Sequence, residues 1–202
     1  FKNLDILKKN VLAGYVVTCI GDSGNFSYLS SRFGDTLVDR ATIHTLKHFT
    51  KKYNMYSFEK FRASDERQYC SPGVDLPIGS LTRSRPGHYP EYHTSGDNLN
   101  IVTEKNLNQS IKMYLRCLEI IEKNNTYCST ILCEPMMGKR NLYPQISKKG
   151  KKDNNVYDMM DILAFCDGKK DLLWIADKLD KSFHQLLPSV KILLENDLIK
   201  EV

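Results

Sequence analysis

Runs of apolar residues and helical stripes of apolar residues alternate along the first part of the chain. Residues 4–11 are typical of the end of a helix, and Gly14 precedes a short β-branched run that predicts a buried strand at Tyr15–Ile20. Apolar positions at near-helical spacing predict helices over 36–52 and 104–123. A second strand is expected at Leu76–Leu81. This alternation of strands and helices predicts an α/β domain.

The loops of such a domain are the expected place for a binding site. In an open, largely parallel sheet, ligands bind at the loops beyond the carboxyl ends of the strands. Those loops here begin at Cys19 and run through Asp65 and His93. The stretch 83–97 is rich in Arg, Pro, Gly, Tyr and His, and a loop of that length in a compact domain is commonly functional or disordered.

The pattern changes after a segment without periodicity. Three short helices are predicted at 156–165, 172–179 and 182–195, followed by a strand at 198–202. Three helices and a strand are typical of a winged helix-turn-helix. We therefore expect an α/β domain over 1–133, a linker over 134–152 and a winged-helix domain over 153–202.

The composition of the chain indicates the cellular compartment in which we expect the protein. No apolar run approaches the length of about 20 residues that spans a bilayer, so we expect no membrane contact. The six cysteines are scattered and form no Cys-x-x-Cys pair, which favours reduced thiols in a cytoplasmic protein. The chain opens with Phe1 inside a helical pattern rather than with Met, and we interpret it as part of a longer protein.

Charge is distributed unevenly along the chain. From Asp153 onward there are ten acidic residues and six Lys and Arg, a net charge of −4. Since the whole chain carries +5, the first 152 residues carry +9. DNA binding by a winged helix needs a basic face for the phosphates. The acidic balance favours contact with a protein, or packing within the same molecule, over DNA. The Lys-rich stretch 148–152 is interpreted as a solvated linker, with nucleic-acid attraction as the alternative.

Reactive side chains gather in two segments. One is Ser64–Cys70 and the other is Tyr92–Asp97. By residue type alone they define a polar site and nothing sharper, because a single loop histidine is commonly a surface residue and Asp65-Glu66-Arg67 is compatible with ordinary ion pairs.

The two segments resemble the closing half of the di-zinc aminopeptidase superfamily, which also contains the glutaminyl cyclases. That pattern is Ser-Asp-His, a Gly-x-Pro turn with a strand, and His-Thr-x-x-Asp-Thr-Leu before a long helix. The run from Ser64 to Ser80, with His93-Thr94-Ser95-Gly96-Asp97, is similar to one bacterial branch with a C-terminal winged helix. Members of that branch often lie in gene clusters for surface polysaccharide or flagellin glycan. The resemblance implies an incomplete aminopeptidase-like sheet, mixed or parallel, with flanking helices.

The resemblance also implies zinc ligands. His93 matches the last ligand histidine of the superfamily, and imidazole is a common zinc donor. Cys19 stands where relatives have a carboxylate ligand, so it could replace that ligand, or Asp22 could supply an oxygen from the next turn. A mono-zinc site and a buried cysteine with no ligand role remain open alternatives. Asp97 is expected to influence the His93 loop.

The remaining candidates are assigned to substrate binding or to support of the ligands. Glu66 stands where relatives often have histidine, which departs from the general pattern. Arginine binds carboxylates in bidentate fashion, so a substrate acid could be held at this wall, although structural ion pairs explain these residues equally well. The full set is Asp22, Asp65, Glu66, Arg67, Gln68, Arg83, Arg85, Tyr92 and Asp97.

These residues supply at most two metal ligands and no general base. In the superfamily the first zinc histidine, the bridging Asp and a Glu-Glu pair precede the strand that begins at Tyr15. We therefore expect a zinc-dependent peptidase or amidase for a small amide or peptide-like substrate in the longer protein, and no activity in these 202 residues alone. The alternative is a non-catalytic regulatory or scaffold protein whose winged helix binds a partner or DNA.

Overall fold

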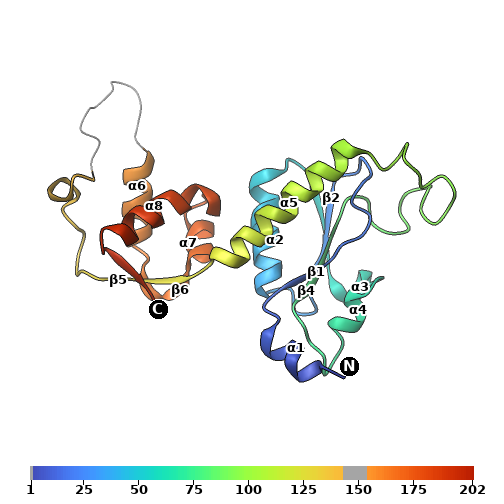
Figure 1. Cartoon of the computed structure of the whole chain (residues 1–202), viewed down its shortest axis with the longest axis horizontal. Coiled ribbons are helices and arrows are strands. Elements are labelled where there is room, and N and C mark those ends of the chain that lie inside the picture. Colours follow the sequence, from blue (N-terminus) through green and yellow to red (C-terminus); the bar gives the residue numbers. More distant parts are fainter. Residues whose placement is uncertain (1, 143–153) are drawn as a thin grey trace. The chain divides into compact units, whose positions relative to one another are not determined.

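A computed structural model describes residues 2–142 and 154–202 of the chain, which divides into two compact units at Glu122 and Lys123 (Figure 1). The elements of the first unit, in chain order, are α1 (Leu4–Asn10), β1 (Gly14–Val16), β2 (Phe26–Leu29), α2 (Leu37–Phe49), β3 (Tyr53–Tyr56), α3 (Phe58–Phe61), α4 (Glu66–Tyr69), β4 (Ile78–Thr82) and α5 (Glu104–Lys123). The predicted helices at the start, middle and end of this unit are thereby confirmed.

The sheet of the first unit is mixed. Its strand order is β1-β4-β2-β3, with β1 parallel to β4, β2 parallel to β3, and β2 antiparallel to β4. The register pairs Gly14 with Ile78 and Ser27 with Thr82. The predicted fold class, a mixed or parallel sheet with flanking helices, is confirmed.

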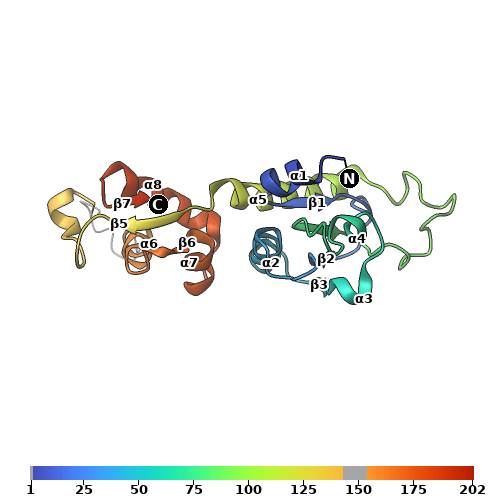
Figure 2. The same cartoon turned by 90° about the horizontal axis from the view of Figure 1, so that it is seen from below.

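Helices cover both faces of this sheet. On one face α2 and α5 pack through Leu46, Met113 and Cys117 against Tyr28 and Leu81 of the strands, with further members of the cluster around them. On the other face, α1 and the α3–α4 segment pack against Val16 and Ile78. Side chains alternate between the faces of a strand, so each strand contributes to both layers. Figures 1 and 2 show α2 and the α3–α4 segment on opposite sides of the strands.

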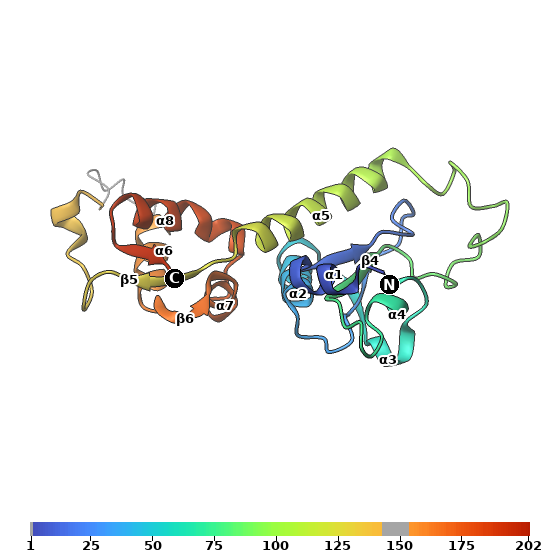
Figure 3. The same cartoon turned by 60° about the horizontal axis from the view of Figure 1, so that its bottom comes forward.

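The second unit is a winged helix built on a three-stranded antiparallel sheet. Its elements are β5 (Thr126–Ser129), the 3₁₀ helix η1 (Met137–Arg140), α6 (Asn154–Leu163), β6 (Asp167–Asp171), α7 (Leu172–Lys178), α8 (Phe183–Glu195) and β7 (Ile199–Glu201). The central strand is β5, which pairs with β6 on one side and β7 on the other. The three predicted helices and the final strand are present, and Figure 3 shows them around β5.

The two units meet earlier in the sequence than the expected end of the first domain at residue 133. The reason is β5, which lies before the expected boundary at residue 133 but forms the centre of the second sheet. The expected linker 134–152 contains η1, with Met137 buried, and its residues 143–152 lie outside the described residues.

Among the described residues, four strands were not predicted, and the strand expected over 15–20 has half of its expected length. Strands β2, β3, β5 and β6 contain serines, asparagines, lysines or aspartates that hide the apolar pattern. The strand expected over 15–20 ends at Val16, and Cys19 has a φ of +48°, which is incompatible with extended backbone. Among the described residues, none of the helices has the length and apolar character needed to cross a membrane.

Candidate functional site

A cleft of about 340 Å³ lies where the loop after β1 faces the long loop before α5. Five of the residues predicted for the site line it: Cys19, Asp22, Tyr92, His93 and Asp97. Cys19 and His93 are 74 positions apart in the sequence. Their shared cleft arises because β1 and β4 are parallel neighbours whose following loops leave the same edge of the sheet.

The two candidate ligands share an unusual backbone conformation. Cys19 has a φ of +48° and His93 a φ of +58°, both in the left-handed region that non-glycine residues seldom adopt. The Cys19 carbonyl is fixed by the backbone N–H of Arg83, which donates to it over 2.8 Å. The His93 ring stacks on Tyr92 with ring centroids 3.9 Å apart. Asp75, Cys133 and other described residues also have a positive φ, so the shared cleft rather than the backbone conformation distinguishes these two residues.

Tyr89 connects the two sides of the cleft, and sequence reasoning missed it. Its hydroxyl lies 3.2 Å from Asp97 Oδ2 and 3.7 Å from Cys19 Sγ. A phenol has one proton, so it donates to one of these acceptors at a time. Burial raises the pKa of Tyr89, and the nearby Cys19 and Asp97 raise it further, which keeps the hydroxyl protonated. Its place between the two predicted loops was not visible in the sequence.

A zinc site needs at least three protein ligands around one point, and the described side chains of this cleft do not provide them. Structural zinc sites have four protein ligands and catalytic sites three. Within residues 2–142 and 154–202, no three His, Cys, Asp or Glu side chains gather as a group that could hold a metal ion. Cys19 and His93 fit zinc by donor type and share one cleft, but the described residues do not complete a coordination sphere around them.

The side chains of Asp22 and Arg83 hold the loops at this edge of the sheet. The Asp22 carboxylate accepts hydrogen bonds from Gly24 N at 2.7 Å, from Ser84 Oγ at 2.6 Å and from Ser84 N. Arg83 Nη1 donates to Gly24 O over 3.0 Å, and its guanidinium lies 4.5 Å from the Phe26 ring centroid. Burial lowers the pKa of Arg83, partly offset by Asp22. These contacts indicate a structural role for both residues.

The second predicted cluster lies apart from this cleft. Asp65, Glu66, Arg67 and Gln68 form the short helix α4 and its first turn, and none of them lines the Cys19–His93 cleft. Glu66 is buried, and its Oε1 accepts hydrogen bonds from the backbone N–H groups of Ala63 and Ser64 at 2.7 and 2.9 Å.

Glu66 lines a different cavity of about 20 Å³, together with Arg85 and the buried Ser80 and Thr82 of β4. Arg85 packs over the Phe61 ring at 4.2 Å. A cavity of that size has room for about one water molecule.

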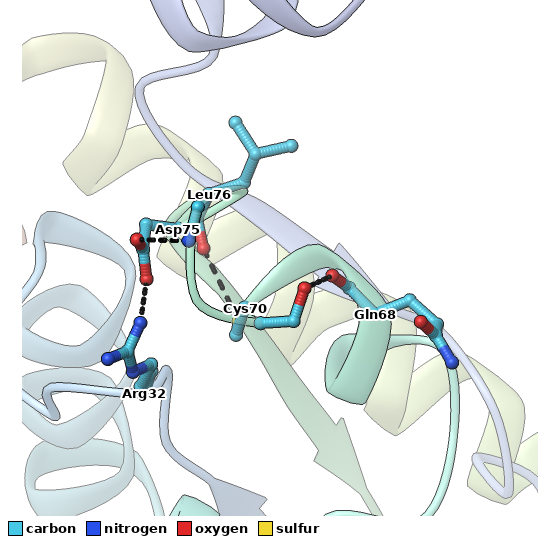
Figure 4. Close-up of polar contacts among 7 residues, drawn as sticks. Arg32, Gln68, Cys70, Asp75 and Leu76 are labelled. Carbon is cyan, nitrogen blue, oxygen red and sulfur yellow. Dashed lines mark hydrogen bonds and ion pairs between the residues drawn. The ribbon is translucent and has the colours of Figure 1, made fainter. Parts of the chain in front are cut away.

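The turn after α4 fixes this helix on β4. The Cys70 Sγ lies 3.3 and 3.1 Å from the carbonyl oxygens of Leu76 and Ile78 and donates its single proton to one of them at a time; burial raises its pKa and keeps the thiol protonated. Asp75 has a φ of +51° and forms an ion pair with Arg32. Figure 4 shows this turn, with Arg32 reaching Asp75 and Cys70 facing Leu76.

Comparison with known proteins identifies the family. Residues 1–124 match the family described as "Domain of unknown function (DUF4910)", and residues 125–201 match a winged helix-turn-helix. The first match covers more than half of the chain, so this protein belongs to that family. The division between the two matches agrees with the boundary of the two units.

Two relatives come from Clostridium acetobutylicum. One is named "Putative polysaccharide biosynthesis protein with aminopeptidase-like domain"; it is 38% identical over all 202 residues, which correspond to 46% of its own length. The other is a crystal structure of a "putative peptidase", with a TM-score of 0.87 and 37% identity, covering all of this chain and 44% of that one. The chain thus spans about half the length of the relatives it matches. An aminopeptidase from Aneurinibacillus sp. strain AM-1 aligns with 57% of this chain and 27% of its own at a TM-score of 0.45 and 12% identity, too distant to support an argument.

Proposed function

We propose that this chain forms one wall of the active site of a zinc-dependent, aminopeptidase-like hydrolase, a peptidase or amidase for a small amide or peptide-like substrate. The observation that carries the proposal is the cleft that Cys19 and His93 both line, each on left-handed backbone. Relatives named as a peptidase and as a polysaccharide biosynthesis protein with an aminopeptidase-like domain support the hydrolase class. A link to surface-glycan metabolism is part of the proposal.

His93 and Cys19 would hold the metal, the former through a neutral imidazole and the latter through its thiolate. The chemistry that zinc supplies when bound is activation of a water molecule and polarisation of a carbonyl. Tyr92 stacks on the His93 ring and limits its rotation. Tyr89 keeps a protonated hydroxyl between Asp97 and Cys19, where it can orient either side chain or donate to a substrate oxygen.

The remaining ligands and the general base are proposed to come from the rest of a longer protein. The relatives are more than twice as long as this chain, and the described residues contain no third ligand grouped with Cys19 and His93. Accordingly, the 202 residues alone are expected to have no hydrolase activity.

Metal analysis of the full-length protein tests the proposal. We expect zinc to co-purify, and His93→Ala to lower the zinc content at least several-fold, because a lost ligand leaves an incomplete coordination sphere. His88→Ala is the matched control, since His88 is an exposed histidine of the same loop and does not line the cleft. Retention of full zinc content by His93→Ala, or absence of zinc from the unmodified protein, would contradict the proposal.

The winged helix is proposed to contact a protein or another part of the same molecule. Its helix α8 exposes Gln185, Pro188, Lys191 and Glu195, and the single lysine of that group faces Glu195 at 3.8 Å. A helix face with no net positive charge is poorly suited to DNA phosphates. If this contact were the whole function, the protein would be a regulatory or scaffold protein, and the zinc measurement above distinguishes the two classes.

A further inference from the structure

A second, larger cleft of about 510 Å³ lies beside α3 and α4. Three arginines line it, and we refer to it as the arginine cleft: Arg32 from the loop after β2, Arg62 at the end of α3, and Arg67 on α4. It shares no lining residue with the Cys19–His93 cleft.

Two of the three guanidinium groups are held in place by the protein. Arg32 forms an ion pair with Asp75, as Figure 4 shows, and lies 4.9 Å from the Phe33 ring centroid. Arg62 Nη1 donates to the Glu59 carbonyl over 2.8 Å, and its guanidinium lies 5.6 Å from the Phe58 ring centroid. An arginine has five N–H donors, so each group keeps donors for a ligand while its position is fixed.

The third guanidinium, that of Arg67, is exposed and makes no hydrogen bond or ion pair with the described residues. The cleft is also lined by one carboxylate, that of Glu59. This group accepts a hydrogen bond from Ser57 Oγ over 2.6 Å, which lowers its pKa and keeps it ionised. With Glu59 in the lining and Asp75 paired to Arg32, the three guanidinium groups leave these five groups with one net positive charge.

The remaining residues that line the arginine cleft are suited to an organic ligand rather than to an inorganic ion alone. Phe58 and Pro72 contribute an apolar wall, and Ser71 lies next to Pro72. The volume falls within the roughly 300–1,000 Å³ of small-molecule sites. Guanidinium groups bind phosphate and carboxylate oxygens in bidentate fashion, and an apolar wall can pack against the ring of a sugar.

We propose that the arginine cleft binds a sugar-sized anionic ligand through its phosphate or carboxylate group. Phosphate and carboxylate both present negatively charged oxygens that guanidinium groups bind. The apolar wall would pack against the sugar ring that carries the anionic group. The inference does not depend on zinc or on hydrolysis, because it concerns residues outside the Cys19–His93 cleft.

Calorimetric titration of the intact protein at low ionic strength tests this site, with glucose 1-phosphate, glucuronate, glucose and inorganic phosphate as the probes. We expect the two anionic sugars to bind and glucose not to bind. Arg67→Gln should weaken binding about tenfold or more, the usual effect of losing a charge-assisted hydrogen bond. Arg140→Gln, an exposed arginine of the second unit, is the matched control and should leave the affinity unchanged.

Arg67 is exposed, so its substitution should leave the melting temperature unchanged, and Arg62→Gln provides a second variant with the same expected loss. The proposal is overturned if neither anionic sugar binds, if glucose binds equally well, or if both arginine variants retain full affinity. Inorganic phosphate binding as tightly as glucose 1-phosphate would overturn the assignment of a sugar-sized ligand. Binding of acidic polymers such as heparin without either sugar would instead make the cleft an interface for an acidic macromolecule.

Discussion

The individual side chains near the two clefts differ in how many hydrogen bonds they make with the rest of the protein. Asp22 and Arg83 are buried and bonded to neighbouring segments, Asp22 to Ser84 and Arg83 to Gly24 and Gln109, whereas Arg67 is exposed and keeps its donors. Cys19 and His93 lie between these cases, because their backbone is left-handed and their side chains line open space. Residue type alone does not distinguish structural residues from ligand-binding residues, since the sequence does not show whether an aspartate is buried or binds a ligand.

The cysteines provide a prediction at this scale. Cys133 is exposed, whereas Cys166 is buried, and burial raises the pKa of Cys166 to about 12, with smaller contributions from Cys128 and Asp167. We expect Ellman's reagent at pH 8 to label Cys133 in the folded protein at least ten times faster than Cys166, because the thiolate is the nucleophile. Mass spectrometry of the labelled peptides identifies the sites, and denatured protein is the control. Equal labelling of both residues in the folded state would contradict the burial of Cys166.

The same pKa predicts a pH dependence of stability. The folded pKa of Cys166 lies above the value of about 8.5 for an unfolded thiol, so its contribution is complete below that pH. As pH rises from about 8.5 toward 12, the unfolded state loses the proton first and this contribution is lost.

At the scale of elements, the caps of the winged helix define where its helices begin. Asp171 accepts a hydrogen bond from Trp174 N over 2.8 Å at the start of α7, and its other oxygen accepts one from Asn124 Nδ2 over 2.9 Å. Ser182 caps α8 in the same way through Gln185 N. The turn between these helices is tied to α6 by Lys181, which donates to Asp158 and Asp161 at 2.7 and 2.6 Å.

Removal of the first cap should destabilise this unit. Asp171→Ala loses the acceptor for Trp174 N, and we expect the free energy of unfolding to fall by about 1–2 kcal/mol in urea titrations followed by Trp174 fluorescence. Asp171→Asn retains an acceptor oxygen and should recover most of that loss. If the alanine and asparagine variants were equally stable, the cap would not contribute to the stability of α7.

At the scale of the whole molecule, the sign of the net charge changes within the second unit. Residues from Asp153 onward carry −4, although the complete chain carries +5. Residues 123–152 contain seven Lys and Arg and one acidic residue, a net charge of +6, so the acidic stretch that holds α8 follows a basic stretch within the same unit.

This distribution predicts weak nucleic-acid binding by the winged helix. We expect no salt-sensitive mobility shift of duplex DNA attributable to α8, even at about 50 mM salt, where phosphate contacts are strong. The measurement compares the unmodified protein with Lys191→Glu, which reverses the exposed lysine of α8. A shift that is present at low salt and lost in Lys191→Glu would show that α8 binds DNA after all.

The sequence by itself determined the elements with strong periodicity. Helices α2, α5 and α8 were predicted because their apolar residues recur at helical spacing, and the final strand because its apolar residues follow a helix end. The resemblance of the sequence motifs to the aminopeptidase superfamily gave His93, Cys19 and Asp97 as candidates. These features depend on local order along the chain, and local order is what a sequence displays directly.

The tertiary structure decided which of these residues meet. Parallel pairing of β1 and β4 brings Cys19 and His93 into one cleft, and the same structure assigns Asp22 and Arg83 to loop contacts and places α4 at other cavities. The tertiary structure also shows that β5 belongs to the second sheet, because β5 pairs with β6 and β7, which lie about 40 and 70 residues later in the chain. The sequence of a strand does not specify which distant strand it pairs with, so neither the domain boundary nor the arginine cleft could be predicted from the sequence alone.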